Sequence, residues 1–325
     1  MLRSRVHCII MQKLIAFLRL IRSLNLLFIV LTQCSVQYFI IKPILAQAGA
    51  VPTLDELHFI LLVAATVLIA AAGYVINDYF DVKVDEVNKP GRIFIDRVIT
   101  RRAAMLLHQM FTGTGVLLAL YVAWHAGNFK LGFIHPIVAA FLWFYSTGYK
   151  RKLLLGNLLV AFLTGFVILI VALYEKSLFN PMNAAVQRAA YSTIVIVFAY
   201  FIFAFLVSLA RELVKDMEDV EGDRSFGSKT VPIAMGVYRT KGLVYGILVF
   251  ILMLLIYIQW IEISGGDFIS ALTVFTTVEF PVLVSLYLLR QASTSAQFHS
   301  VSSVIKVVMF MGILTMLYFY LLIRG

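Results

Sequence analysis

The sequence predicts an all-α, polytopic membrane protein whose nine transmembrane helices form a single bundle. Three observations support this prediction. Hydrophobic residues make up 62% of the 325-residue chain and charged residues only 14%. Apolar segments long enough to cross a bilayer recur along the whole length, and the charged residues sort into alternate loops. Soluble domains are far less apolar, so this class is excluded.

Each predicted span is an apolar segment of about 20 residues, the length that crosses about 30 Å of hydrocarbon as a helix. The segments lack the alternation of a membrane β-strand, so helices are expected to satisfy the backbone within lipid. A basic segment, residues 1–23, precedes them and is interpreted as interfacial. In chain order the spans are Leu24 to Leu45, Leu57 to Ile76, Met105 to Trp124, Leu131 to Thr147, Leu153 to Leu173, Ser192 to Ala210, Leu243 to Ile261, Ile269 to Leu289 and Val304 to Ile323.

The basic residues predict the orientation of the bundle. If the N-terminus and every second loop share one side, that side holds most of the 27 lysines and arginines. By the positive-inside rule this side is cytoplasmic. The topology explains the net charge of +10 without a nucleic-acid partner. We therefore predict a multi-pass protein of the cell inner (cytoplasmic) membrane, surrounded by membrane lipids, with a cytoplasmic N-terminus and no obligate protein partner. The basic residues on the opposite side are Lys42, Lys130, Lys176, Arg188 and Arg324.

Two polar loops on the predicted cytoplasmic side, residues 77–104 and 211–242, hold most of the 17 acidic residues. Each loop includes a triplet of aspartates spaced at intervals of three and four residues. The matching intervals suggest two related halves, about residues 24–150 and 153–325, within a single domain of residues 1–325. The two triplets are Asp78, Asp81 and Asp85, and Asp216, Asp219 and Asp223.

Placed on a helix, either triplet directs its three carboxylates to one face. Because like charges on one stripe repel, we expect a counterion, and hard oxygen ligands with room for water and phosphate suit Mg²⁺. Two such stripes facing each other could bridge a diphosphate through the metal. The alternative is that these aspartates cap helices or lie in solvated turns.

The acidic segments resemble the two aspartate motifs of the UbiA superfamily of intramembrane prenyltransferases. The first motif reads NDYFDVKVD from Asn77 and the second reads KDMEDVEGD from Lys215. The resemblance covers the whole chain. It implies a UbiA-like domain with a cytoplasm-facing active-site cavity, Mg²⁺ as cofactor, and transfer of a polyprenyl group from its diphosphate to a lipid-soluble acceptor. The second motif is most similar to enzymes that add geranylgeranyl to geranylgeranylglyceryl phosphate. The first motif departs from the common pattern at Gly91-Arg92-Ile93, which argues against a quinone branch.

The resemblance also implies roles for individual residues. Asn77 and the first triplet form one metal and diphosphate half-site, and the second triplet forms the other. Loss of the metal-bound diphosphate leaves an allylic cation, which the acceptor attacks. The expected catalytic residues are Asp78, Asp81, Asp216, Asp219 and Tyr145. The expected diphosphate ligands, which could instead reflect positive-inside topology or snorkelling, are Arg22, Asn25, Lys150, Arg151, Arg211 and Lys215.

Other functions stay open from the sequence alone. An aromatic quinone precursor of the 4-hydroxybenzoate, homogentisate or dihydroxynaphthoate type could attack the same cation. An ion-coupled transporter would carry acids inside its spans, whereas apart from Glu279 the predicted span interiors are nearly free of carboxylates. A scaffold would leave the repeated triplet unexplained. The scattered histidines His58, His108, His125 and His135 lack the spacing of a zinc site and are interpreted as packing or interfacial residues.

Overall fold

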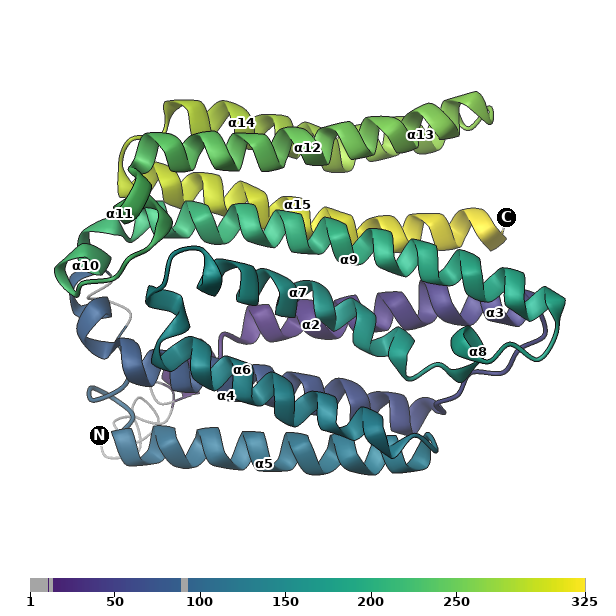
Figure 1. Ribbon diagram of the computed structural model, residues 1–325, viewed down its shortest axis with the longest axis horizontal. Coiled ribbons are helices and arrows are strands. Elements are labelled where there is room, and N and C mark those ends of the chain that lie inside the picture. Colours follow the sequence, from purple (N-terminus) through teal and green to yellow (C-terminus); the bar gives the residue numbers. More distant parts are fainter. Residues whose placement is uncertain (1–10, 12–13, 89–92, 325) are drawn as a thin grey trace. The chain divides into compact units, whose positions relative to one another are not determined.

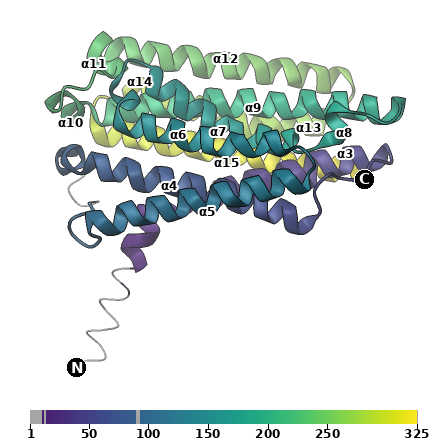
Figure 2. The same ribbon diagram turned by 60° about the horizontal axis from the view of Figure 1, so that its bottom comes forward.

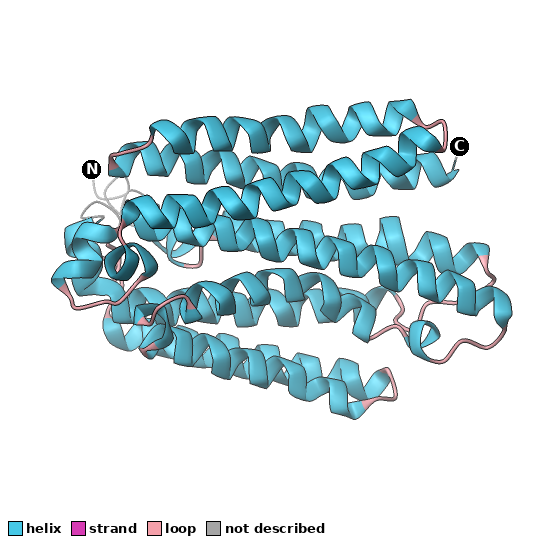
Figure 3. Cartoon of the chain, turned by 45° about the horizontal axis from the view of Figure 1, so that its top comes forward, coloured by secondary structure: helices cyan, strands magenta, loops and turns pink. Residues whose placement is uncertain are grey.

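A computed structural model describes residue 11 and residues 14–88 and 93–324. This part of the chain consists of helices and their connecting loops (Figure 3). Within the described ranges, nine helical segments are long and apolar enough to cross a membrane, which confirms the predicted number of spans. They are Ser23–Gln47, Glu56–Asn88, Arg101–His125, Phe129–Thr147, Leu155–Leu173, Ala184–Glu218, Val237–Ser264, Phe268–Gln291 and Ser295–Leu322.

The chain divides into two compact units, and the division falls inside the first span. Unit 1 comprises Met1–Leu31 and Thr53–Lys150, and unit 2 comprises Thr32–Pro52 and Arg151–Gly325. The first span therefore begins as α2 (Ser23–Ser35) and continues in unit 2 as the π-helical η1 (Val36–Ile41) and α3 (Lys42–Gln47). That the chain acts as one domain stays a prediction.

Unit 1 is built on the long helix α4 (Glu56–Asn88), which packs against α5 (Arg101–His125) and α6 (Ile134–Thr147) (Figure 2). The 3₁₀ turn η3 (Phe129–Phe133) leads from α5 into α6. Helix α4 has 33 residues, or about 50 Å at 1.5 Å per residue, which exceeds the thickness of the hydrocarbon core. Its last turns can therefore carry polar residues beyond the apolar part of the helix.

A small apolar cluster holds these last turns of α4 in place. Val75 and Val82 on α4 are buried together with Ile93 and Ile95 of the following segment and with Leu20. Burial of apolar side chains contributes about 25 cal/mol per Å² removed from water. The cluster thus fixes the helix face from which the first aspartate triplet projects.

Unit 2 is organised around α9 (Ala184–Glu218), which packs against α7 (Leu155–Leu173), α12 (Val237–Ser264) and α15 (Ser295–Arg324) (Figure 1). Its core contains Leu213 and Val214 of α9 with side chains from α12, α14 (Phe280–Gln291) and α15. The short turn η4 (Tyr149–Arg151) leads into this unit from Lys150. The remaining elements are α8 (Lys176–Phe179), α10 (Val220–Ser225), α11 (Val231–Met235), α13 (Phe268–Val274), the π-helical η5 (Phe275–Glu279) and α14 (Phe280–Gln291).

Close packing of α7 on α9 depends on Gly165. A Cβ atom at this position would lie 2.8 Å from Cδ2 and 3.0 Å from the carbonyl oxygen of Phe201. We expect Gly165→Ala to destabilise the protein by about 1–3 kcal/mol through overpacking, measured as a lower thermal unfolding midpoint in detergent. Gly246→Ala on α12 is the matched control, because its Cβ would meet no atom within 4 Å. An equal loss in both variants would contradict this assignment.

Candidate active site

The first aspartate triplet lies on the last turns of α4, as the helical spacing predicted. Asp78, Asp81 and Asp85 are half-buried, and the helix continues beyond them to Asn88. Asn77 joins them, because its Nδ2 donates to Oδ2 of Asp81 at 2.9 Å. The structure therefore collects four oxygen-bearing side chains at one end of unit 1.

Two cations of unit 1 pair with these carboxylates. Arg22 Nη2 donates to Asp78 Oδ1 at 2.9 Å. Lys150 Nζ donates to Asp81 Oδ1 and, at 3.5 Å, to Asn77 Oδ1. Both side chains of the Lys150–Asp81 pair are largely shielded, with 13% and 16% exposed. The structure thus places both cations beside the carboxylates of the first triplet, and their binding of a diphosphate stays a prediction.

The backbone at Arg22 is unusual and helps to place its side chain. Its φ is 51°, a left-handed conformation that is uncommon for residues with a Cβ atom and costs about 1–3 kcal/mol where the surroundings impose it. The guanidinium lies 5.0 Å from the centroid of the Tyr74 ring, a cation–π distance. Tyr145 also belongs to the electrostatic surroundings of Arg22. Arg22 directly precedes α2, and this geometry directs its side chain toward Asp78 on α4.

The other predicted residues near this boundary are placed by their backbones. Asn25 donates its backbone N–H to the carbonyl of Arg22 at 2.7 Å. Arg151 is exposed, and its carbonyl accepts a hydrogen bond from the backbone N–H of Lys229 at 2.9 Å. The functions of the Asn25 and Arg151 side chains stay predictions.

The second triplet is divided between two helices, and here the prediction of one continuous helical stripe was wrong. Asp216 lies on the last turns of α9, Asp219 lies between α9 and α10 with φ −100° and ψ 9°, and Asp223 lies on α10. Aspartate competes for backbone hydrogen bonds and favours helix ends over helix interiors. The chain nevertheless stays compact, since the backbone N–H of Asp223 donates to the Asp219 carbonyl at 3.1 Å.

An asparagine supports the second half-site. Asn157, on the first turn of α7, is buried, and its Nδ2 donates to Oδ2 of Asp216 at 2.8 Å. The sequence analysis did not predict a contact between this residue and an aspartate. A polar residue at the start of an otherwise apolar span was the available signal.

Glu212 is the second residue that the sequence analysis missed. Lys215 Nζ donates to both of its carboxylate oxygens at 3.0 Å, and Arg211 Nη1 donates to Oε1 at 3.4 Å. The available signal was its position in the sequence: Glu212 directly follows Arg211 and precedes Lys215 by three residues, and both are predicted diphosphate ligands. Glu212 thus orients both cations one turn before Asp216.

We expect Asn157→Ala to weaken metal use by the second half-site. The substitution removes a donor from the Asp216 carboxylate, and loss of such supporting hydrogen bonds typically costs about 10–100-fold in metal affinity or activity. The measurement is the Mg²⁺ concentration that gives half-maximal activity, which should rise. Asn128→Ala, in an exposed loop, is the control. An unchanged Mg²⁺ requirement would show that Asn157 only packs.

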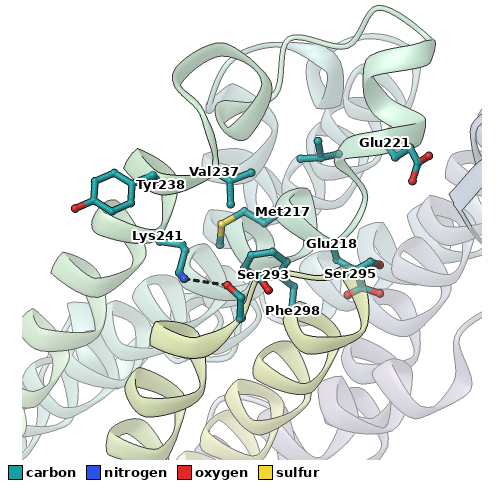
Figure 4. Close-up of a pocket in the computed structure, with 11 residues that line it drawn as sticks. Met217, Glu218, Glu221, Val237, Tyr238, Lys241, Ser293, Ser295 and Phe298 are labelled. Atoms are coloured by element: carbon teal, nitrogen blue, oxygen red, sulfur yellow. Dashed lines mark hydrogen bonds between the residues drawn. The ribbon is translucent and has the colours of Figure 1, made fainter.

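A pocket of about 460 Å³ opens beside the α9–α10 junction (Figure 4). Lys241 lies on its wall, but its Nζ donates to the carbonyl oxygens of Ala292 at 2.9 Å and Arg290 at 3.0 Å. Glu218 and Glu221 also line the pocket. Because the lysine is already bonded and two carboxylates also line the pocket, the pocket is poorly suited to an anion, and the diphosphate is not assigned to it.

The donor chemistry of both half-sites fits Mg²⁺. Their side chains offer carboxylate and amide oxygens, the hard ligands that Mg²⁺ prefers alongside water and phosphate oxygens. The half-site of unit 1 provides Asn77 and the first triplet, and that of unit 2 provides Asp216, Asp219 and Asp223. Nearby cations can neutralise the phosphate oxygens that such a metal would bring.

Comparison with known proteins decides the family. A model of the UbiA prenyltransferase family matches residues 38–320, which include both acidic helix ends. The chain belongs to this family. It is therefore a multi-pass membrane enzyme of the prenyltransferase class, with a prenyl diphosphate and a prenyl acceptor as its substrates. This confirms the predicted family and enzyme class.

Named relatives of this UbiA family member share most of its length. It is 29% identical over 273 residues to digeranylgeranylglyceryl phosphate synthase of Thermococcus kodakarensis, covering 84% of this chain and 88% of the relative. The enzyme of the same name from Korarchaeum cryptofilum is 33% identical over 261 residues, covering 77% and 81%.

Solved structures share the fold of this UbiA family member. A structure of digeranylgeranylglyceryl phosphate synthase in membranes aligns with TM-score 0.63 and 24% identity, covering 95% of this chain and 99% of that one. A UbiA homologue from Archaeoglobus fulgidus bound to GPP and Mg²⁺ aligns with TM-score 0.55 and 16% identity, covering 91% and 98%. These likenesses confirm the all-α membrane fold.

Proposed function

We propose that this UbiA prenyltransferase moves a geranylgeranyl group from its diphosphate to geranylgeranylglyceryl phosphate, with Mg²⁺ as cofactor. The observation that carries the proposal is the acidic helix end in each unit, backed by an amide donor and by cations. The names of the relatives support the acceptor. The homologue bound to GPP and Mg²⁺ supports the prenyl donor and the metal.

In this proposal the aspartates of both triplets, together with Asn77, hold Mg²⁺ against the diphosphate. When bound, Mg²⁺ offsets the negative charge that develops on the departing diphosphate. The C–O bond between the prenyl group and the diphosphate breaks, and its electron pair stays on the diphosphate. The acceptor hydroxyl forms a new C–O bond to the allylic carbon and releases its proton to water. The product is an ether.

The remaining predicted residues bind and orient the substrates. Arg22, Lys150, Arg211 and Lys215 supply positive charge to the diphosphate oxygens, because guanidinium groups bind phosphate in a bidentate manner and ammonium groups act as compact charges. Asn25 and Arg151 add hydrogen bonds at the same rim. Tyr145 contacts the diphosphate at this rim through its hydroxyl group.

We further propose that the two units work as one membrane domain, with the N-terminus and both acidic helix ends in the cytoplasm of a cell bounded by its inner membrane. The excess of basic residues on that side supports this orientation. The active-site cavity would then open to the cytoplasm.

An acceptor panel tests the function. Purified protein receives geranylgeranyl diphosphate, Mg²⁺ and one acceptor at a time, and mass spectrometry identifies the products. We expect an ether product with geranylgeranylglyceryl phosphate and none with 4-hydroxybenzoate, homogentisate or dihydroxynaphthoate. Prenylation of an aromatic ring in place of the glyceryl phosphate would contradict the acceptor, and no transfer to any acceptor would contradict the proposed reaction.

A further inference from the structure

Three potential metal ligands meet at the end of unit 1 that is remote from the aspartate triplet. Asp55 directly precedes α4, His58 lies on the first turn of α4, and His125 is the last residue of α5. Asp78 follows Asp55 by 23 residues, which corresponds to about 35 Å along the helix. The cluster is therefore distinct from the first half-site.

The three side chains converge on one point. His58 Nδ1 lies 2.8 Å and 2.9 Å from the two carboxylate oxygens of Asp55. His125 Nε2 lies 3.6 Å from Asp55 Oδ2. The two imidazole rings stack with their centroids 3.3 Å apart and an interplanar angle of 5°. One ligand atom from each residue can be chosen so that all lie within 4.8 Å of one another.

Helix capping accounts for only part of this cluster. Asp55 Oδ1 accepts the backbone N–H of His58 at 2.9 Å, as an N-cap aspartate does. A cap needs no imidazole, yet two imidazoles from different helices meet here. If both were protonated, they would repel at this separation. A bound cation would compensate the carboxylate. Because a neutral imidazole donates through the lone pair in its own ring plane, the exposed His125 ring would turn out of the stack so that both rings can ligate the ion.

We propose that Asp55, His58 and His125 bind a divalent transition-metal ion of the Zn²⁺ class. Two imidazole nitrogens and one carboxylate oxygen suit Zn²⁺, Ni²⁺ or Cu²⁺ and are unlike the all-oxygen ligand sets of Mg²⁺. The ion would join the start of α4 to the end of α5, so its role is structural. Neither the UbiA family assignment nor the prenyl-transfer proposal requires it.

The exposure of the three side chains suits such a site. The His58 side chain is only 8% exposed, whereas those of Asp55 and His125 are 58% and 38% exposed. His58 Nε2 is buried and has no hydrogen-bond partner among the described residues, which leaves Nδ1 as its ligand atom. The buried histidine fixes one ligand, and the exposed side leaves an entry path and room for water to complete the coordination.

Copper EPR of the purified full-length protein tests the site. At less than one Cu²⁺ per chain, we expect superhyperfine splitting from two nitrogen ligands, which the aspartate half-sites would not produce. Asp55→Asn keeps an N-cap side chain and removes the charged ligand, and His125→Gln alters an exposed residue. Either variant should lower Zn²⁺ affinity by at least about tenfold, and His125→Gln should also remove one nitrogen coupling.

Two controls make the result specific. His299→Gln removes an exposed histidine that contacts Glu218 at 3.0 Å and should leave the copper spectrum unchanged. Asp78→Asn should retain both nitrogen couplings, so the site can be judged even if prenyl transfer is never observed. An oxygen-only spectrum, or Zn²⁺ affinity unaffected by His125→Gln, would overturn the proposal and leave the cluster as a helix cap with stacked histidines.

Discussion

Asp78→Asn and Asp216→Asn are each expected to reduce the rate of prenyl transfer by about 100-fold or more, the usual cost of removing one electrostatic contact to a transition state. Asparagine keeps the shape of the side chain and can still accept the hydrogen bond from Arg22 or from Asn157. The change therefore removes a negative metal ligand while preserving local packing. The measurement is the rate of product formation at saturating prenyl diphosphate and several Mg²⁺ concentrations.

The matched control for these variants is Asp267→Asn. Asp267 caps α13 by accepting the backbone N–H of Ser270 at 3.0 Å, a bond that asparagine can also accept. Its activity should stay within about twofold of the unmodified protein, because surface changes away from the site have small effects. Nearly full activity in Asp78→Asn or Asp216→Asn would remove that aspartate from the catalytic site.

Lys150→Met should have opposite effects on metal and on substrate. The ammonium group pairs with Asp81, so its removal leaves the charge of that carboxylate uncompensated by lysine and is expected to strengthen Mg²⁺ binding in the absence of substrate. The same substitution removes the positive charge that Lys150 is proposed to place beside the diphosphate. Because hydrogen bonds to charged groups contribute about 1.5–3 kcal/mol, KM for prenyl diphosphate should rise by about 10–100-fold.

This pair of opposite changes distinguishes a specific role from general damage. A misfolded protein would lose affinity for both ligands. Lys130→Met, at an exposed lysine of η3, is the control for loss of one positive charge. If Lys150→Met leaves KM unchanged, Lys150 contributes to the folded state and not to binding of the diphosphate.

The number and order of the spans could be predicted because the bilayer demands helical segments of about 20 apolar residues. The ends of the helices could not be predicted in this way. The second span was predicted to end at Ile76, but helix α4 continues to Asn88. The sixth was predicted to end at Ala210, but α9 continues to Glu218. Hydropathy marks where a helix meets lipid, whereas its hydrogen bonds continue into polar sequence.

Contacts within the candidate site could be predicted where their signal is local and were missed where they depend on tertiary packing. The interval from Asn77 to Asp81 is about one helical turn, and in the structure these two side chains form a hydrogen bond. The contact of Asn157 with Asp216 joins residues 59 positions apart, a separation with no periodic signal. The meeting of His58 and His125 likewise depends on α4 and α5 packing side by side.

The most direct test of the proposed site is the affinity of a non-reactive prenyl thiolodiphosphate, measured with and without Mg²⁺ in the unmodified protein, Asp78→Asn and Asp216→Asn. If aspartates from both units hold one diphosphate through metal, binding should require Mg²⁺ and should weaken by about tenfold or more in each variant. Equally tight binding without Mg²⁺, or full affinity in either variant, would contradict a diphosphate shared by the two acidic helix ends.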